Sequence, residues 1–167
     1  MRVLAIDPGL TRCGIAVVAG GAGRQVKLLF AGTIRTDADL ELGKRLEAVE
    51  QGILEVADNF SPEVLAIEQV FSQHNVMTVI GTAQSAGVAA LTGAKLGLPT
   101  SFYTPSEVKA AVSGNGRADK QQVATMVSRI VSQDLPGPAD LTDAVALGVC
   151  HLWRSSIANK QGDERSA

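Results

Sequence analysis

The sequence predicts one α/β domain with a mixed five-stranded sheet and helices on both faces. Two observations carry this prediction. The chain opens with three short apolar segments separated by turns, and it continues with alternating helical and strand-like segments. Its 167 residues, 46% of them hydrophobic, suffice for one sizeable core. We expect the domain to span residues 1–157, followed by a flexible tail at 158–167 that contains no large apolar residue.

The first half of the chain predicts a strand meander followed by a helix. Strands are expected at residues 2–7, 13–19 and 25–36, because an Asp-Pro-Gly turn ends the first strand and a glycine-rich link joins the other two. Apolar residues then recur every three or four positions over residues 42–60, which indicates an amphipathic helix.

The second half alternates strands and helices, which adds two crossover strands to the meander. The expected elements are a strand at 63–68, a helix at 75–96, a strand near 99–103, a helix at 105–112, a loop at 113–117, and helices at 119–132 and 138–157.

The charge balance argues against a generally basic nucleic-acid-binding domain. The formal net charge is −2 and the isoelectric point is about 5.7, whereas such domains usually lie above about 9. The charge is nevertheless uneven, because residues 37–68 carry nine acidic and two basic side chains. Most of this acidity lies on or beside one helix, whose polar face we expect to point away from any nucleic acid.

The remaining composition predicts a soluble cytoplasmic protein. Cys13 and Cys150 have no CxxC spacing and suggest no disulfide framework. The start of the chain reaches Asp7 too early for a signal peptide. Residues 69–94 lack charged side chains but contain several polar ones, so a membrane span is not expected.

Two apolar strands each end in a carboxylate at the same position. Asp7 follows the run Val-Leu-Ala-Ile, and Glu68 follows a second copy of that run. If the strands are parallel neighbours, the two carboxylates emerge at one sheet end, roughly 5 Å apart. Like charges that close repel unless a cation lies between them. Asp7 alone could equally cap its turn, whereas a carboxylate that ends a fully apolar strand is rarely structural.

A second acidic pair, Asp140 and Asp143, begins the last helix. Their spacing places them on one helix face. Alone they would be ordinary first-turn acids that complement the helix dipole, with Asp140 as a candidate N-cap. Together with the strand carboxylates they suit two Mg²⁺ or Mn²⁺ ions, which prefer oxygen ligands and can clamp a phosphodiester during hydrolysis. Two such ions would offset the negative charge and make affinity for a phosphate-rich strand depend on metal.

Several motifs together resemble the RuvC-type Holliday junction resolvases. They are residues 6–14 (Ile-Asp-Pro-Gly-Leu-Thr-Arg-Cys-Gly), 66–71 (Ala-Ile-Glu-Gln-Val-Phe) and 140–147 (Asp-Leu-Thr-Asp-Ala-Val-Ala-Leu), with a basic stretch at 108–109 and 119–123. The early Asp-x-Gly is weak by itself, but its combination with Glu-Gln-Val-Phe and Asp-x-x-Asp is specific. The resemblance covers residues 1–155 in the family's order and spacing.

The resemblance implies a ribonuclease-H-like fold of the retroviral-integrase superfamily and a homodimeric, Mg²⁺-dependent endonuclease. Such an enzyme makes paired symmetric nicks in four-way DNA junctions during homologous recombination and DNA repair, and it leaves 5′-phosphate and 3′-hydroxyl ends. The four acids would be catalytic and would bind two Mg²⁺ ions per subunit, with Mn²⁺ as a substitute. RuvA and RuvB would be partner proteins.

Further residues are candidates for DNA contacts, each with an ordinary structural alternative. Phe71 could stack on an unpaired junction base or be buried under its loop. The cations Lys109, Arg117 and Lys120 flank a glycine-containing loop and could contact phosphates or be solvated. Thr11, Arg12 and Gly14 lie near the Asp7 turn and could position a phosphate. The small residues of the helix at 75–96 suit either a dimer contact or packing on the sheet.

Three other interpretations remain open. A YqgF-like nuclease would keep the fold and act on RNA, although Glu-Gln-Val-Phe favours the junction enzyme. An actin-like ATPase or sugar kinase needs two such domains, for which the chain is too short. A non-catalytic junction-binding module is disfavoured by four acids that would repel phosphate without a metal.

Overall fold

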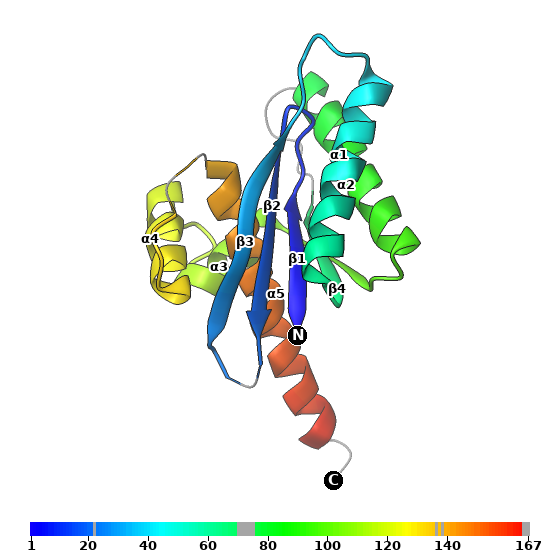
Figure 1. The fold of residues 1–167 in the computed structure, drawn as a ribbon. Coiled ribbons are helices and arrows are strands. Elements are labelled where there is room, and N and C mark those ends of the chain that lie inside the picture. Colours follow the sequence, from blue (N-terminus) through cyan, green and yellow to red (C-terminus); the bar gives the residue numbers. More distant parts are fainter. Residues whose placement is uncertain (22, 70–75, 136, 138, 165–167) are drawn as a thin grey trace.

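A computed structural model describes residues 1–21, 23–69, 76–135, 137 and 139–164 (Figure 1). The elements are β1 (Arg2–Asp7), β2 (Arg12–Gly20), β3 (Val26–Arg35), α1 (Leu42–Phe60), β4 (Val64–Glu68), α2 (Val76–Lys95), β5 (Thr100–Tyr103), α3 (Pro105–Ser113), α4 (Lys120–Val131) and α5 (Ala139–Glu164). Every expected strand and helix is present, and the ends agree within one residue except at the end of α5.

The sheet has the order β3-β2-β1-β4-β5. β1, β2 and β3 form an antiparallel meander, whereas β4 pairs parallel with both β1 and β5. Ile6 lies opposite Ile67 in the β1–β4 register. This mixed topology is the predicted one, and it makes the two repeated apolar strands direct neighbours.

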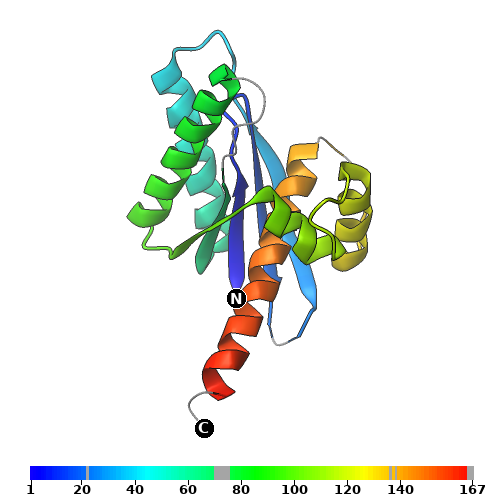
Figure 2. The same ribbon diagram turned by 180° about the vertical axis from the view of Figure 1, so that it is seen from behind.

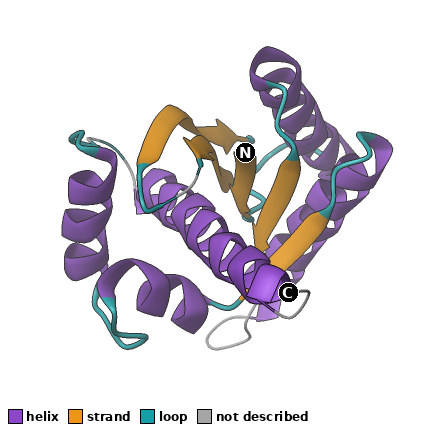
Figure 3. Ribbon diagram, turned by 90° about the horizontal axis from the view of Figure 1, so that it is seen from below, coloured by secondary structure: helices purple, strands orange, loops and turns teal. Residues whose placement is uncertain are grey.

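Both faces of the central strands are covered by helices, which explains why these strands are apolar throughout. Alternate residues such as Leu4, Ile6 and Leu65 pack with α1 and α2 on one face. The intervening residues, including Val3 and Ala66, pack with α3, α4 and α5 on the other. Figure 3 shows these two helical layers on either side of the sheet.

The last helix, α5, packs across the second face of the sheet (Figure 2). Gly148 permits close contact, because a β-carbon there would lie 2.7 Å from Cγ2 of buried Val18. The expected end of this helix near residue 157 is wrong, since α5 runs to Glu164. The added segment includes Gly162, but it contains no proline to stop the helix, and Ala158, Lys160, Gln161 and Glu164 are good helix formers. The flexibility of the tail stays a prediction.

Both ends of the described chain lie at the edge of the sheet where β1 begins (Figure 1). The Met1 amino group donates a 2.8 Å hydrogen bond to the carbonyl of Gly20, and it lies 3.6 Å from a carboxylate oxygen of Glu63. The far end of α5 projects beyond the same edge.

The two cysteines, Cys13 and Cys150, are free and buried, as their spacing suggested. Burial raises the pKa of each thiol to about 11, so both are protonated at neutral pH. Among the helices that the structure describes, none is long and apolar enough to cross a membrane.

The close approach of α5 to the sheet predicts opposite effects for two glycine substitutions. Gly148→Ala should lower the free energy of unfolding by about 1–3 kcal/mol, because its methyl group overpacks the contact with Val18. Gly43→Ala in α1, where nothing lies within 4 Å of the added carbon, should be neutral or stabilising by up to about 1 kcal/mol. Urea unfolding of both variants measures the difference, and equal effects would contradict the packing argument.

Candidate active site

The sheet topology brings Asp7 and Glu68 together. They end adjacent parallel strands that are in register, so both lie at the same edge of the sheet. Side chains alternate between faces along a strand. Asp7 therefore shares the face of Val3 and Ala5, and Glu68 shares that of Val64 and Ala66. Both carboxylates consequently lie on the face that α5 covers.

The start of α5 supplies Asp140 and Asp143 to the same edge. Gly14, which lies opposite Asp7 in the β1–β2 register, makes this approach possible. A β-carbon on Gly14 would overlap the backbone carbonyl of Asp140 and lie 3.2 Å from Cβ of Asp7. The structure thus gives Gly14 a packing role, since any larger residue would push α5 away from the strands.

The pKa shifts show that the four acids form one electrostatic cluster. The pKa of Asp7 is raised well above its ordinary value by burial and then by Glu68, Asp143 and Asp140. Burial and Asp143 raise the pKa of Glu68 to about 7. Burial and Asp140 likewise raise the pKa of Asp143. Like charges have therefore been collected where neighbouring carboxylates oppose the ionisation of Asp7, Glu68 and Asp143.

Two of the predicted cations, Lys109 and Lys120, lie near this cluster. Both lower the pKa values of Glu68 and Asp143, which opposes the effect of burial. The ammonium of Lys120 lies 3.9 Å from Oδ2 of Asp143, and its side chain is 80% exposed, so the pair is weak and the lysine is free to move.

The other predicted DNA contacts have different surroundings. Nε of Arg12 lies 2.8 Å from Oδ2 of Asp140. The Thr11 hydroxyl accepts a 2.8 Å hydrogen bond from Arg45. Arg117 is exposed, and its backbone N–H donates to the Asn115 side chain. Within the described residues, it forms no hydrogen bond or ion pair with any of the four acids. Phe71 lies outside the described residues.

The four carboxylates fit hard divalent cations by chemistry, since all offer oxygen ligands. Oδ2 of Asp140 is buried and accepts no hydrogen bond, although it forms the ion pair with Arg12, so a ligand position is left over. In the described part of the chain, no three acidic, histidine or cysteine side chains converge closely enough to ligate one ion. Mutual repulsion and the Arg12 contact are consistent with this spread in the metal-free structure.

This fold and cluster match a known family. A family model described as crossover junction endodeoxyribonuclease RuvC matches residues 3–151. The chain belongs to the RuvC family. The crossover junction endodeoxyribonuclease RuvC of Saccharopolyspora erythraea is 59% identical over 161 residues, covering 96% of this chain and 81% of the relative. That of Streptomyces avermitilis is 56% identical over 161 residues, covering 96% and 92%.

Solved structures agree with the family membership. Thermus thermophilus RuvC in complex with a Holliday junction substrate aligns with a TM-score of 0.89 at 30% identity, covering 95% of this chain and 96% of that chain. The yeast mitochondrial Holliday junction resolvase Ydc2 aligns with a TM-score of 0.68 at 10% identity, covering 98% and 85%, and shows the fold alone. The ribonuclease-H-like fold is thereby confirmed, and the family is one of metal-dependent nucleases.

Sequence reasoning missed the residues that hold the turn after Asp7. Arg45 donates to Thr11 and also, from Nε, to the Thr36 hydroxyl at 2.9 Å. The hydroxyl of buried Ser85 in α2 donates to the carbonyl of Gly9 at 3.4 Å. Arg45 lies within the acidic block, where a cation is easily taken for a solvated partner of neighbouring acids. Nothing local in the sequence indicates these long-range contacts.

The Arg12–Asp140 ion pair predicts that Arg12 competes with metal. Arg12→Gln should tighten Mn²⁺ binding by about two- to fivefold in the absence of DNA, because Asp140 loses a partly exposed partner. Calorimetric titration of the purified protein measures this. Arg35→Gln is the matched control, since Arg35 lies opposite Arg12 in the β2–β3 register and is exposed. Equal affinities of both variants and the unaltered protein would contradict the competition.

The raised pKa of Glu68 predicts a pH-dependent stability of the metal-free protein. The Glu68 carboxyl binds a proton more tightly in the folded than in the unfolded protein. Its contribution to the free energy of unfolding is therefore fully present below the ordinary pKa of 4.5 and is lost as pH rises through about 7. Glu68→Gln cannot ionise and should exceed the unaltered protein in free energy of unfolding by about 1–3 kcal/mol near pH 8. Near pH 5 the difference should shrink.

Urea unfolding with chelator at both pH values tests this expectation. Glu55→Gln, on the exposed side of α1, serves as the control and should show no such pH dependence. A Glu68→Gln variant that is less stable than the unaltered protein near pH 8 would refute the electrostatic argument.

Proposed function

We propose that the protein is a Holliday junction resolvase, a metal-dependent endonuclease that makes paired symmetric nicks in four-way DNA junctions. The observation that carries the proposal is the cluster of Asp7, Glu68, Asp140 and Asp143 at one sheet edge in a member of the RuvC family. The activity would serve homologous recombination and DNA repair in the cytoplasm and would leave 5′-phosphate and 3′-hydroxyl ends.

The four acids would hold two Mg²⁺ ions, with Mn²⁺ as a substitute, which supply an activated water and stabilise the leaving oxygen when bound. Around them the chain provides the electrostatic setting. Burial of Asp7 keeps the site in a low-dielectric environment, where charge interactions are strong. Lys109 and Lys120 offset the negative charge beside the acids, and we assign them to phosphate contacts.

We assign the remaining predicted contacts to the junction strands. Phe71 would stack on an unpaired base near the junction centre. Arg117, on the exposed loop between α3 and α4, would contact a phosphate farther from the cut. Thr11 and Arg12 would lie beside the cleaved strand, at the turn that follows Asp7.

We further propose that the active form is a homodimer that receives junctions from RuvA and RuvB. A four-way junction has two-fold symmetry, so a symmetric dimer with one site per subunit can cut matching strands. Support for a dimer face comes from α2, whose Val76, Ile80 and Leu91 are 74%, 45% and 56% exposed. Exposed small residues such as Ala83 and Gly87 lie on the same helix.

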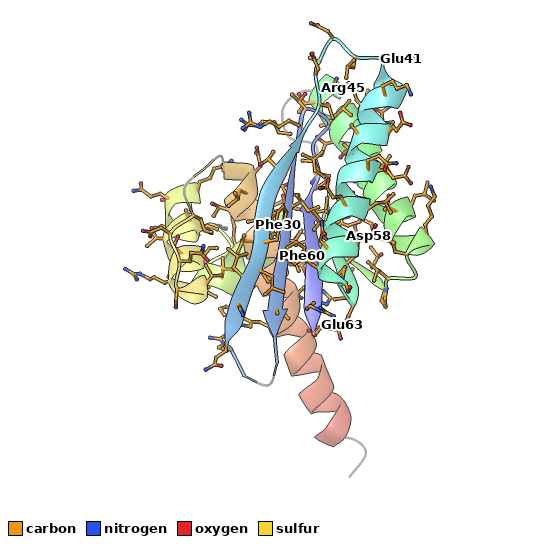
Figure 4. All side chains as sticks on the ribbon, in the orientation of Figure 1. Phe30, Glu41, Arg45, Asp58, Phe60 and Glu63 are labelled. Atoms are coloured by element: carbon orange, nitrogen blue, oxygen red, sulfur yellow. The ribbon has the colours of Figure 1, made fainter. Side chains whose placement is uncertain are left out.

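Cleavage assays with three substrates test the proposal. The purified protein is offered a four-way DNA junction, a matched duplex and a structured RNA, each with Mg²⁺, Mn²⁺ or chelator. We expect metal-dependent cutting of the junction alone and at least about a hundredfold loss in Asp7→Asn or Glu68→Gln. Asp58→Asn removes an exposed carboxylate of α1 far from the cluster and should retain full activity (Figure 4).

Other outcomes separate the alternatives. Cutting of RNA with an intact junction would favour the YqgF-like function instead. Tight junction binding without cleavage under any metal condition would indicate a binding module. Full activity of Glu68→Gln would remove Glu68 from the proposed site.

A further inference from the structure

Arg45 is a cation held in a fixed position beside the candidate active site. It lies in the first turn of α1, at the sheet edge where β1 ends (Figure 4). Its Nε donates to the Thr36 hydroxyl at 2.9 Å, and one terminal nitrogen donates to the Thr11 hydroxyl at 2.8 Å. The Thr36 hydroxyl in turn donates to the carbonyl of Leu10. The guanidinium is therefore oriented by neutral groups on two segments.

Its charge has no carboxylate partner within the described residues, where Arg45 forms no ion pair. Other cations of the same layer differ, since Lys44 pairs with Glu47 at 2.8 Å and Lys95 with Glu50 at 2.6 Å. Arg45 is half-buried, and a guanidinium carries five N–H donors. The hydrogen bonds to the Thr36 and Thr11 hydroxyls occupy two of these donors, and the others remain available. A partly desolvated cation with spare donors and no counter-charge is suited to an external anion.

A cleft in front of Arg45 gives such an anion access. The cleft has a volume of about 600 Å³ and lies between the turn after β1, the start of α1 and the first turns of α2. Arg12 and Arg45 contribute charge to its wall, and Thr78 and Thr82 contribute hydroxyl-bearing side chains. Among the described residues that line it, the one acid is Asp140, which is already paired with Arg12.

The position of Asp140 relates the cleft to the cut. Asp140 belongs both to the acidic cluster and to the cleft wall. An anion bound at Arg45 would therefore lie next to the reacting phosphate, on the side of α1 and α2. Lys109 and Lys120 act on the cluster from α3 and α4, which cover the other face. Arg45 and the two lysines thus belong to helices on opposite faces of the sheet.

We propose that this cleft binds a backbone phosphate adjacent to the scissile one, on the same DNA strand, with Arg45 as its fixed donor. The inference rests on the proposed nuclease function and adds a specific subsite to it. A phosphate presents several acceptor oxygens to a planar guanidinium and to neighbouring hydroxyls, which matches the donors of the cleft. Two anchored phosphates would fix the direction of the strand through the site.

Methylphosphonate interference tests the subsite. Single neutral methylphosphonate linkages are placed, one at a time, on each side of the cut in a four-way junction. Binding is measured in chelator, where no cleavage takes place. The unaltered protein should lose affinity by roughly tenfold at one flanking linkage, the size of one charge-assisted hydrogen bond. Arg45→Gln should bind unmodified DNA weaker by a similar factor and show no further loss at that linkage.

The loss of affinity at each linkage distinguishes a phosphate contact by Arg45 from a purely structural role. If Arg45 only holds the turn after Asp7, Arg45→Gln loses the same factor as the unaltered protein at every linkage, and that result would overturn the proposal. Lys44→Gln removes the neighbouring positive charge and should match the unaltered protein at all linkages. The slope of log affinity against log salt should also fall by about 1 in Arg45→Gln and not in Lys44→Gln.

A second variant at position 45 covers the case in which Arg45→Gln does not fold. If Arg45→Gln does not fold, Arg45→Met keeps the length of the side chain without its charge and should likewise show no further loss at that linkage, and a folded methionine variant that loses the same factor there as the unaltered protein would refute the subsite. Failure of the proposed function appears separately, as absent junction preference or absent metal-dependent cutting on unmodified DNA. The interference comparison can then still be made on duplex or single-stranded DNA.

Discussion

Repulsion among four carboxylates is the constraint around which this structure is arranged. Asp7, Glu68, Asp140 and Asp143 come from three different elements, and neighbouring carboxylates raise the pKa values of Asp7, Glu68 and Asp143. Such a cluster does not assemble by mutual attraction, so the surrounding fold has to impose it. The parallel β1–β4 pair fixes the two strand acids, and the docking of α5 on the sheet fixes the helical pair. The packed core thus holds in place a group of charges that destabilises the metal-free protein.

The sheet achieves this through small residues at close contacts. Gly14 lets the first turn of α5 touch the strand ends, and Gly148 lets the same helix lie close to Val18 two turns later. On the other face, Ser85 and Arg45 hold the turn that follows Asp7 from two different helices. The acids therefore stand on buried, regular elements, while the cations that oppose them have long side chains, of which Lys120 is largely exposed and Lys109 half-buried. A rigid acidic site and adjustable basic surroundings suit a site that must accept both metal and a phosphate backbone.

Much of the fold and the four acids could be predicted from the sequence because their signals are local. Two identical apolar runs ending in a carboxylate indicate neighbouring buried strands, and an i, i+3 spacing indicates one helix face. Arg45 and Gly14 could not be predicted in their roles, since these depend on contacts with residues far away in the chain. The end of α5 also cannot be predicted from composition, because a polar segment alone does not stop a helix.

The placement of the two chain ends has a practical consequence. Met1 is fixed at the edge of the sheet where β1 begins, and α5 projects beyond the same edge, whereas the carboxylates lie at the opposite edge (Figure 1). A fluorophore, affinity handle or surface tether attached at Met1 or at the described end of α5 would therefore sit at the pole remote from the acids. The protein can be immobilised in one orientation by either end with its acidic edge facing solution, which suits single-molecule observation of a nucleic acid at that edge.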